Sequence, residues 1–380
     1  MKIRIGSRFF AIIIFLTIFA PMVFLLSIRS TLWLFPDYID IAFGLIHVTF
    51  SLILILSTLK RNHELDRGLP WRLINYIFFI TLPLISVLIN ENSINDIYRL
   101  ILLILYSFNL LILFPRIAFT LDQYFFKYLT NLYLIFSIFL IVLTSYLFIT
   151  DQNPYTRIGY PLNSGVFAYY MLIAFCISLF IKRRLFLIIF FAAFIIASGS
   201  RLSLILLILI LFFLSDFKAA HKVYMVILLI LFISVLIFLF NSDLLSPYVN
   251  EREDISSGRF YIWKKSLGRL NNLRAILLGY GSEQMISGGR ILENKEYGTH
   301  NAFLNLALQY GIPFSFLSYI LWFINFFPRD LSNVNEYKFR LSLFISITSL
   351  SLFYNIFWLN MGDGATFISL IFLLCDRSPN

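Results

Sequence analysis

The run GTHNAFL at residues 298–304 ends the one long polar interruption in an otherwise apolar chain. That interruption extends from Ser256 to Gly311 and passes, at residue 301, into an apolar stretch. A helix that begins here would present its first backbone N–H groups and the positive end of its dipole to the polar segment, where an anion is favoured. We therefore expect the chemistry of the protein to take place around His300.

The composition indicates a polytopic membrane protein. Of the 380 residues, 60% are hydrophobic and only 13% are charged, whereas a soluble domain has about 25% charged residues. The formal net charge of +10 is dispersed between apolar stretches, so a nucleic-acid partner is not expected. Cys176 and Cys375 both lie in apolar segments and show no metal-ligand spacing. We expect no metal and no cofactor.

Twelve apolar segments approach the length of about 20 residues that a transmembrane helix needs. The predicted fold is all-α, a polytopic membrane helical bundle of about 12 transmembrane helices that forms a single integral membrane domain over residues 1–380. The first segment lacks a small-residue cleavage site, so we expect a retained span rather than a signal peptide. The segments are 9–28, 38–59, 72–90, 98–115, 128–149, 163–181, 184–198, 202–215, 222–241, 301–327, 339–357 and 362–375.

The distribution of basic residues predicts the orientation of these spans. With the N-terminus in the cytoplasm, 18 of the 30 Lys and Arg residues lie in cytoplasmic segments and only four lie in short outer loops. The remaining eight lie in residues 242–299, a long outer loop between spans 9 and 10, where seven acids balance them. Because cytoplasmic loops carry the excess of Lys and Arg, we expect both termini in the cytoplasm.

A transporter or lipid flippase is the main alternative class for such a chain. Coupled transporters keep ionisable residues at mid-membrane, because burying a charge there is costly and is retained for function. Here His47 is the only titratable residue well inside a predicted span, and no acid lies there. We therefore disfavour a transporter, including one for a polysaccharide lipid. A non-catalytic scaffold remains a further alternative.

Two of the short outer loops that carry arginine are candidates for a site. The loop before the sixth span contains Arg157 and Asn163, and the turn between the spans 184–198 and 202–215 contains Ser198 and Arg201. Each of these two spans has only about 14 apolar residues, which is about 21 Å of helix and less than the ~30 Å membrane core. We expect the turn to lie below the outer surface, where a guanidinium is unfavourable unless it meets an anion.

The long outer loop is expected to contain an amphipathic helix in the membrane interface. The helix follows Ser257 and Gly258, which suit a helix start, and it includes Arg259. Its apolar positions recur at helical spacing, as an interfacial helix requires. They are Phe260, Trp263, Leu267 and Leu270.

Each of these polar residues also has a purely structural interpretation. A single outer arginine such as Arg157 or Arg259 usually extends to lipid headgroups, and His300 could simply bond the start of a helix. Several arginines and one histidine on one side of a bundle nevertheless suit one task. Arginine grips phosphate oxygens with two hydrogen bonds, and histidine accepts a proton near neutral pH. A lipid-linked diphosphate and a hydroxyl acceptor would use both.

The order of the motifs resembles a known family. The chain contains SGSRLS at 198–203, SGRFYIWK at 257–264, LGYG at 278–281 and THNAFLNLALQYGIP at 299–313. This set, with its long outer loop, resembles the O-antigen polymerase and O-antigen ligase family of bacterial membrane glycosyltransferases. Residues 157–163 resemble a further element of the family. In that element a proline normally adjoins an asparagine, whereas here Leu162 separates Pro161 from Asn163.

The resemblance implies an inverting glycosyltransferase of the GT-C type that needs no metal and acts in lipopolysaccharide biosynthesis. It would lie in the bacterial inner membrane and act at the periplasmic face, so that residues 242–299 would form a long periplasmic loop. Its donor would be a glycan linked to undecaprenyl diphosphate. By this analogy Arg201 and Arg259 would hold the donor diphosphate, and Arg157 is a weaker candidate. The supporting residues would be Ser198, Ser257, Gly258, Asn301 and Asn163.

The base that activates the acceptor hydroxyl is the second role that the resemblance assigns. His300 is the candidate, either as general base or as a group that orients the acceptor. Asp254, Glu283 and Asp363 stay open as alternatives from the sequence. A diphosphate leaves readily once its charge is stabilised, so fixed cations and positioning can supply most of the lowering of the barrier.

The acceptor separates the two activities within the family. A polymerase transfers a lipid-linked chain to another lipid-linked repeat, whereas a ligase transfers it to lipid A-core. We favour an O-antigen polymerase, because polymerases are numerous and divergent, and keep the O-antigen ligase as the alternative. The expected partners are the lipid-linked oligosaccharide or polysaccharide, one of these acceptors, membrane lipids and a chain-length regulator.

Overall fold

The computed structural model describes most of the predicted bundle. It covers residues 69–90, 94–113, 115, 123–149, 164–215, 259–280, 291–292, 295–296, 301–329, 333–353 and 364–374. The predicted spans 9–28, 38–59 and 222–241 lie outside the described residues. Every other predicted span coincides with a described helix.

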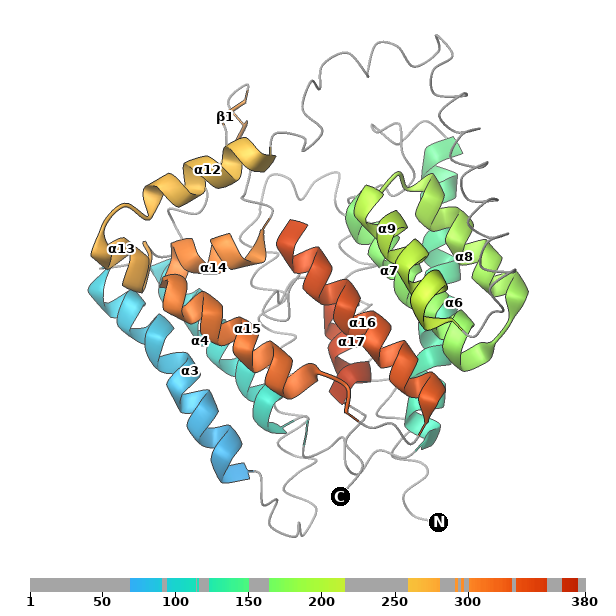
Figure 1. Ribbon diagram of the computed structural model, residues 1–380, viewed down its shortest axis with the longest axis horizontal. Coiled ribbons are helices and arrows are strands. Elements are labelled where there is room, and N and C mark those ends of the chain that lie inside the picture. The colour runs from blue at the N-terminus through green and yellow to red at the C-terminus, as the bar shows by residue number, and fades with distance from the viewer. Residues whose placement is uncertain are drawn as a thin grey trace.

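The prediction of an all-α fold is confirmed, since apart from one hairpin of two-residue strands the described elements are helices (Figure 1). Three helices pass at their ends into π-helical turns, which are labelled η. In chain order the elements are α3 (Leu69–Ile89), α4 (Ile94–Phe108), η1 (Asn109–Leu113), α6 (Gln123–Ile149), α7 (Ser164–Cys176), η2 (Ile177–Lys182), α8 (Leu185–Ala197), α9 (Arg201–Leu209), η3 (Ile210–Leu214), α12 (Arg259–Arg269), α13 (Leu273–Leu278), β1 (Ile291–Leu292), β2 (Lys295–Glu296), α14 (Ala302–Tyr310), α15 (Ile312–Phe326), α16 (Val334–Phe353) and α17 (Gly364–Leu374).

Three of the described helices are long and apolar enough to cross a membrane, judged by length and composition. They are Pro70–Ile89, Phe125–Ile149 and Gly165–Lys182. Shorter apolar helices include Leu185–Ala197 and Arg201–Leu214, the pair that the sequence predicts to be too short to cross upright. The count of twelve spans stays a prediction.

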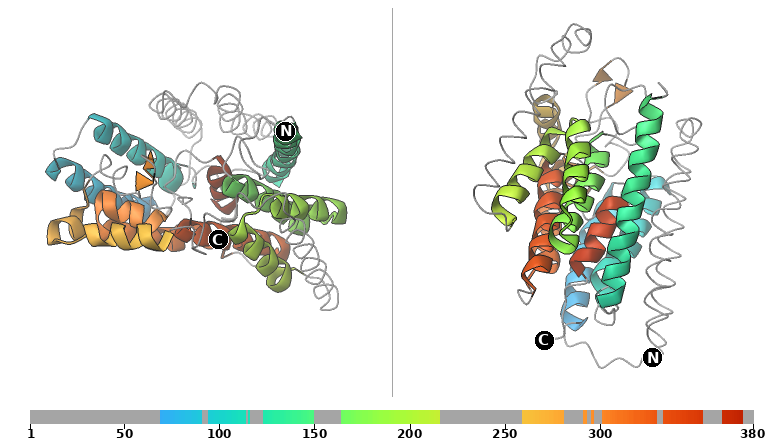
Figure 2. Two further views of the ribbon diagram at one scale, coloured as in Figure 1. Left: turned by 90° about the horizontal axis from the view of Figure 1, so that it is seen from above. Right: turned by 90° about the vertical axis from the view of Figure 1, so that its right-hand side faces the viewer.

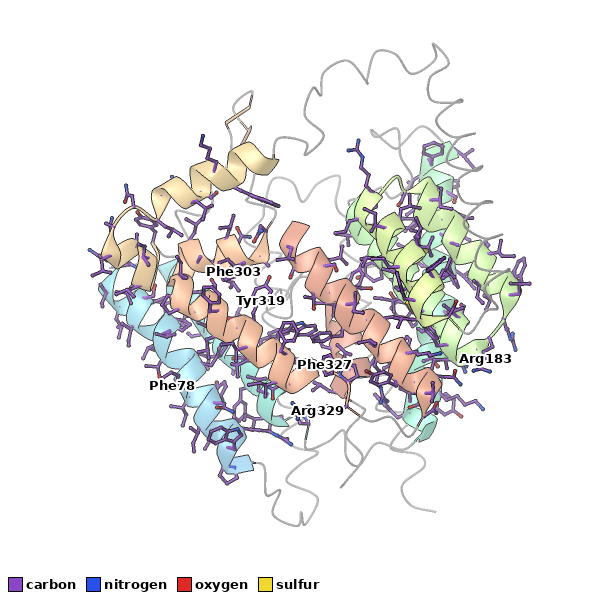
Figure 3. The ribbon with its side chains drawn as sticks, in the orientation of Figure 1. Phe78, Arg183, Phe303, Tyr319, Phe327 and Arg329 are labelled. Atoms are coloured by element: carbon purple, nitrogen blue, oxygen red, sulfur yellow. The ribbon has the colours of Figure 1, made fainter. Side chains whose placement is uncertain are left out.

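Helices α7 and α16 make contacts that connect the two halves of the bundle. α7 contacts α6, α8, α9, α16 and α17 and is buried almost throughout. Seen from above, α6 to α9 gather on one side and α3, α4 and α12 to α15 on the other, with α16 and α17 between them (Figure 2). The core is therefore continuous across α16, while the outer faces carry exposed large apolar side chains such as Phe78 (Figure 3). Lipid is the solvent that suits such faces.

The segment 301–327, predicted as one span, forms two helices. α14 ends at Tyr310 and α15 begins at Ile312, with Gly311 between them at φ 93°. Pro313 lies in the first turn of α15, where its missing N–H costs no hydrogen bond. The break turns α14 away from the direction of α15, so that its start lies at the upper end of the bundle (Figure 1).

Candidate functional site

Ser198 builds the turn between α8 and α9. Its side chain is buried, and its Oγ donates to the carbonyl of Ile195 at 2.6 Å and accepts from the backbone N–H of Ser200 at 3.2 Å. Gly199 takes a positive φ of 66°, a conformation that glycine adopts without steric cost. The hydrogen bonds of Ser198 thus stabilise the turn and fix where α9 begins.

Arg201 is the first residue of α9, and its side chain is exposed. Ser200 makes no side-chain hydrogen bond to the helix start; its Oγ pairs with Oγ of Ser203 at 3.0 Å instead. The first turn of α9 therefore keeps backbone N–H groups that its capping residue does not use. A guanidinium and the positive end of a helix dipole lie together here, as an anionic ligand would require.

α12 is the helix that the sequence predicts in the long outer loop, and Arg259 is its first residue. One side of the helix is buried at Ser266, whereas Lys264 and Leu267 are exposed. Leu270, which follows the helix, packs with Ala275, Ala307 and Leu308. α12 is thereby placed against α14, and its exposed Leu267 suits a position at the membrane surface.

Asn301 begins α14 and connects it to another helix. Its Oδ1 accepts from the backbone N–H of Leu304 at 3.0 Å, and its Nδ2 donates to the carbonyl of Leu352 on α16 at 3.0 Å. The side chain is buried at 9% exposure, so both bonds are made away from water. The backbone N–H of Leu304, one of the donors at the start of α14, is therefore bonded to Asn301 and is not available to an anion.

The sequence does not predict that the LGYG and QYGIP motifs contact each other. Gly279 follows α13 and Gly311 follows α14, and each lies against the backbone of the other helix. A Cβ at Gly279 would lie 2.5 Å from the carbonyl carbon of Gln309, and a Cβ at Gly311 would overlap the carbonyl of Leu277. The backbone N–H of Tyr280 donates to the carbonyl of Leu308 at 2.7 Å. We call this contact the glycine junction.

α3 contacts the glycine junction through hydrogen bonds. The buried Ser86 donates to the carbonyl of Leu278 and approaches that of Gln309 at 3.2 Å. Arg274 on α13 donates in return to the carbonyl of Ile89 at 2.8 Å and to Oδ1 of Asn90 at 3.1 Å. Arg274 therefore stabilises the C-terminal end of α3, where the helix dipole favours a cation.

The elements that carry the candidate residues form a continuous series of contacts. α9 contacts α16, α16 contacts α14, and α14 contacts α12. The α8–α9 turn, α12 and the start of α14 all lie at the same end of the bundle (Figure 1). The backbone at Arg201, Arg259 and Asn301 thus belongs to one end of one packed unit.

Several predicted site residues lie outside what the structure describes, so their roles stay predictions. They are Arg157, Asn163, Ser257, Gly258 and His300, together with the alternative bases Asp254, Glu283 and Asp363; of Arg259 the backbone alone is described.

Comparison with known proteins identifies one family. Residues 185–319 match the family model described as O-antigen ligase. The match begins with α8 and ends within α15, so it includes Arg201, Arg259 and His300, while Arg157 lies before it. No curated protein matches the chain. Over residues 185–319 the chain therefore carries the O-antigen ligase family segment, and the predicted resemblance to the O-antigen polymerase and ligase family is confirmed.

Proposed function

We propose that the chain is a glycosyltransferase that acts at the periplasmic face of the inner membrane on a glycan linked to undecaprenyl diphosphate, as an O-antigen polymerase. The observation that carries the proposal is the family match over residues 185–319, because that one segment contains the motifs of Arg201, Arg259 and His300. The structure supports it by placing an exposed Arg201 at the start of α9.

Arg201 and Arg259, with Arg157 as a weaker third member, would hold the two phosphates of the donor. Each guanidinium can donate two parallel hydrogen bonds to phosphate oxygens and keeps its charge at any physiological pH. The charge that develops on the diphosphate as it leaves would be stabilised by these fixed cations and by the first turn of α9. In this scheme the donor needs no metal ion for its departure.

His300 would take the proton of the acceptor hydroxyl. The hydroxyl oxygen attacks the anomeric carbon from the face opposite the diphosphate, the new glycosidic C–O bond forms, and the bond to the diphosphate oxygen breaks. The proton goes to His300, undecaprenyl diphosphate leaves with the bonding electron pair, and the configuration at the anomeric carbon inverts. Asn301, the next residue, is held on α16 and so limits where this base can lie.

An O-antigen ligase is the second candidate, because the matching family model is described by that activity. The two activities share the donor and the chemistry, and they differ in the acceptor. Deletion of the gene separates them in the lipopolysaccharide pattern on a gel. Loss of a polymerase leaves a single repeat on the core, whereas loss of a ligase leaves an unsubstituted core and lipid-linked polymer.

Single substitutions test the chemistry. Arg259→Ala and His300→Ala are expected to abolish polymer in the deletion strain while the protein still inserts at its normal level. Lys264→Ala, which removes an exposed cation on the same helix as Arg259, is the matched control and should restore normal polymer. Normal polymer from both Arg259→Ala and His300→Ala would refute the transferase. Lipid transport in reconstituted vesicles without sugar transfer would favour the flippase instead.

A further inference from the structure

Basic side chains from separate helices gather at the end of the bundle opposite α12. They come from the first turn of α6, the end of η2, the connection to α8 and the start of α16. Figure 3 shows one of them, Arg183, at this end, far from α12. We call this cluster the basic end. It consists of Lys127, Lys182, Arg183, Arg184, Lys338 and Arg340.

Among the described residues, the basic end has little acid to balance it. Glu336 is the one acid on the helix turns that form it, and it is occupied by Arg340, with Nη2 and Oε2 3.3 Å apart. Arg340 also lies over the ring of Phe126 at 5.6 Å, and Arg183 donates to the side chain of Asn335. Both arginines are therefore held in place by neighbours within the bundle.

Three cations of the basic end, Lys127, Lys182 and Arg184, meet like charges rather than opposite ones in the part of the chain that the structure describes. The charges of Lys127 and Arg184 both act on Lys182, and none of these three has an acidic partner among the described residues. An anion near them would weaken the repulsion.

An exposed apolar face begins directly after Arg184. On α8, Leu185 is 60% exposed, Phe186 is 76% exposed and Ile189 is 61% exposed. Phe186 stacks on Phe190, with ring centroids 6.0 Å apart, so the face continues along the helix. The basic end therefore adjoins the apolar face of α8 where Arg184 is followed by Leu185.

We infer that the basic end binds the phosphate head group of an anionic phospholipid, with an acyl chain lying along α8. An amphiphile with a negative head fits both parts of the surface, because the cations take the phosphate and the apolar face takes the chain. A nucleic acid or an acidic protein would use the cations and leave Phe186 and Ile189 without a partner. By the predicted orientation the lipid belongs to the cytoplasmic leaflet, and the site is separate from the proposed transferase site.

Native mass spectrometry of the purified full-length chain tests this site. The protein is offered cardiolipin, phosphatidylglycerol or phosphatidylcholine with the same acyl chains. The two anionic lipids should be retained and the zwitterionic lipid lost under equal activation. Inorganic phosphate at millimolar concentration should not displace the bound lipid. Equal retention of all three lipids, or displacement by phosphate, would overturn the inference without any variant being needed.

Matched triple variants locate the site. Lys127→Gln, Lys182→Gln and Arg184→Gln together should weaken retention of the anionic lipids, by about fivefold for each charge removed. Lys127→Arg, Lys182→Arg and Arg184→Lys together keep every charge and should retain the lipids as the unchanged protein does. Retention by the neutral variant at the unchanged level would contradict the assignment.

Discussion

At the scale of single residues, the glycine junction shows how two helix ends can meet without side chains between them. Gly279 and Gly311 both take a positive φ. At each glycine, the position that a Cβ would occupy lies against the backbone of the other helix. Any larger residue would push α13 away from α14. The junction therefore fixes α13, which follows α12 and its first residue Arg259, relative to α14, which follows His300.

Substitution of Gly279 by alanine is expected to destabilise the protein. The left-handed conformation and the overlap with the carbonyl of Gln309 together should cost about 2–4 kcal/mol. Thermal unfolding of the purified protein in detergent measures the effect as a lower midpoint. Gly268→Ala is the matched control, since no atom lies within 4 Å of its Cβ position on α12. It should leave stability unchanged or raise it, by less than about 1 kcal/mol; equal losses from both variants would argue against the junction.

The same scale shows what the sequence could not reveal about the site. Arg201, Arg259 and His300 are predicted as site residues by residue type and by the motifs around them. Ser86 carries no such mark, because a serine in an apolar helix usually bonds its own backbone. Its acceptors lie 192 and 223 residues further along the chain, and no local pattern indicates so distant a contact.

At the scale of elements, α15 and α16 are joined by aromatic and polar contacts inside the apolar bundle. The ring of Trp322 stacks on Phe344 with centroids 4.9 Å apart, and its Nε1 donates to Oγ1 of Thr348 at 2.9 Å. Tyr319, one turn earlier, donates to Oγ of Ser351 at 2.8 Å. Ser351 is followed by Leu352, whose carbonyl accepts from Asn301, so α16 contacts both α15 and the start of α14 at this point.

A double-mutant cycle on Tyr319→Phe and Ser351→Ala measures one of these bonds. Each change removes one partner and little volume, so the interaction energy should be about 0.6 kcal/mol, the average for side-chain hydrogen bonds between membrane helices. Unfolding of the two single variants and the double variant in detergent gives this value. Additive losses, with no coupling, would show that the bond contributes nothing to the packing of α15 on α16.

The elements also show where sequence patterns stop being informative. The break between α14 and α15 has local markers in Gly311 and Pro313, because each residue has a local conformational reason to end or begin a helix. The π-helical turns η1, η2 and η3 have no such marker: their residues are as apolar as the α-helices before them. A π-turn differs by one residue in its hydrogen-bond spacing, and packing around the turn rather than composition selects it.

At the scale of the whole molecule, the two ends of the bundle differ in character. One end carries the α8–α9 turn, α12 and the start of α14, and the other carries the basic end (Figure 1). The basic excess in the cytoplasmic segments predicts that the basic end faces the cytoplasm. The sequence could predict this orientation because it depends on charge counts along the chain. It could not predict that α16 would connect α9 to α14, because that depends on tertiary packing.

Labelling of single cysteines tests the orientation of the whole molecule. In a variant in which Cys176 and Cys375 are replaced by alanine, cysteine is introduced at Lys264 on α12 or at Lys127 on α6. Both lysines are exposed, and Figure 1 shows α12 and the start of α6 at opposite ends of the bundle. A membrane-impermeant maleimide should label Lys264→Cys in cells with a permeabilised outer membrane, because the reagent then reaches the periplasm.

Lys127→Cys should be labelled only after the inner membrane is opened, because we expect it in the cytoplasm. The two variants control for each other, since each replaces an exposed helical lysine by the same thiol. The reverse pattern would place α12 and the start of α14 in the cytoplasm. A donor that has already crossed the membrane could not then reach Arg259, and the proposed transferase would have to be abandoned, whereas the anionic lipid site would remain and belong to the outer leaflet.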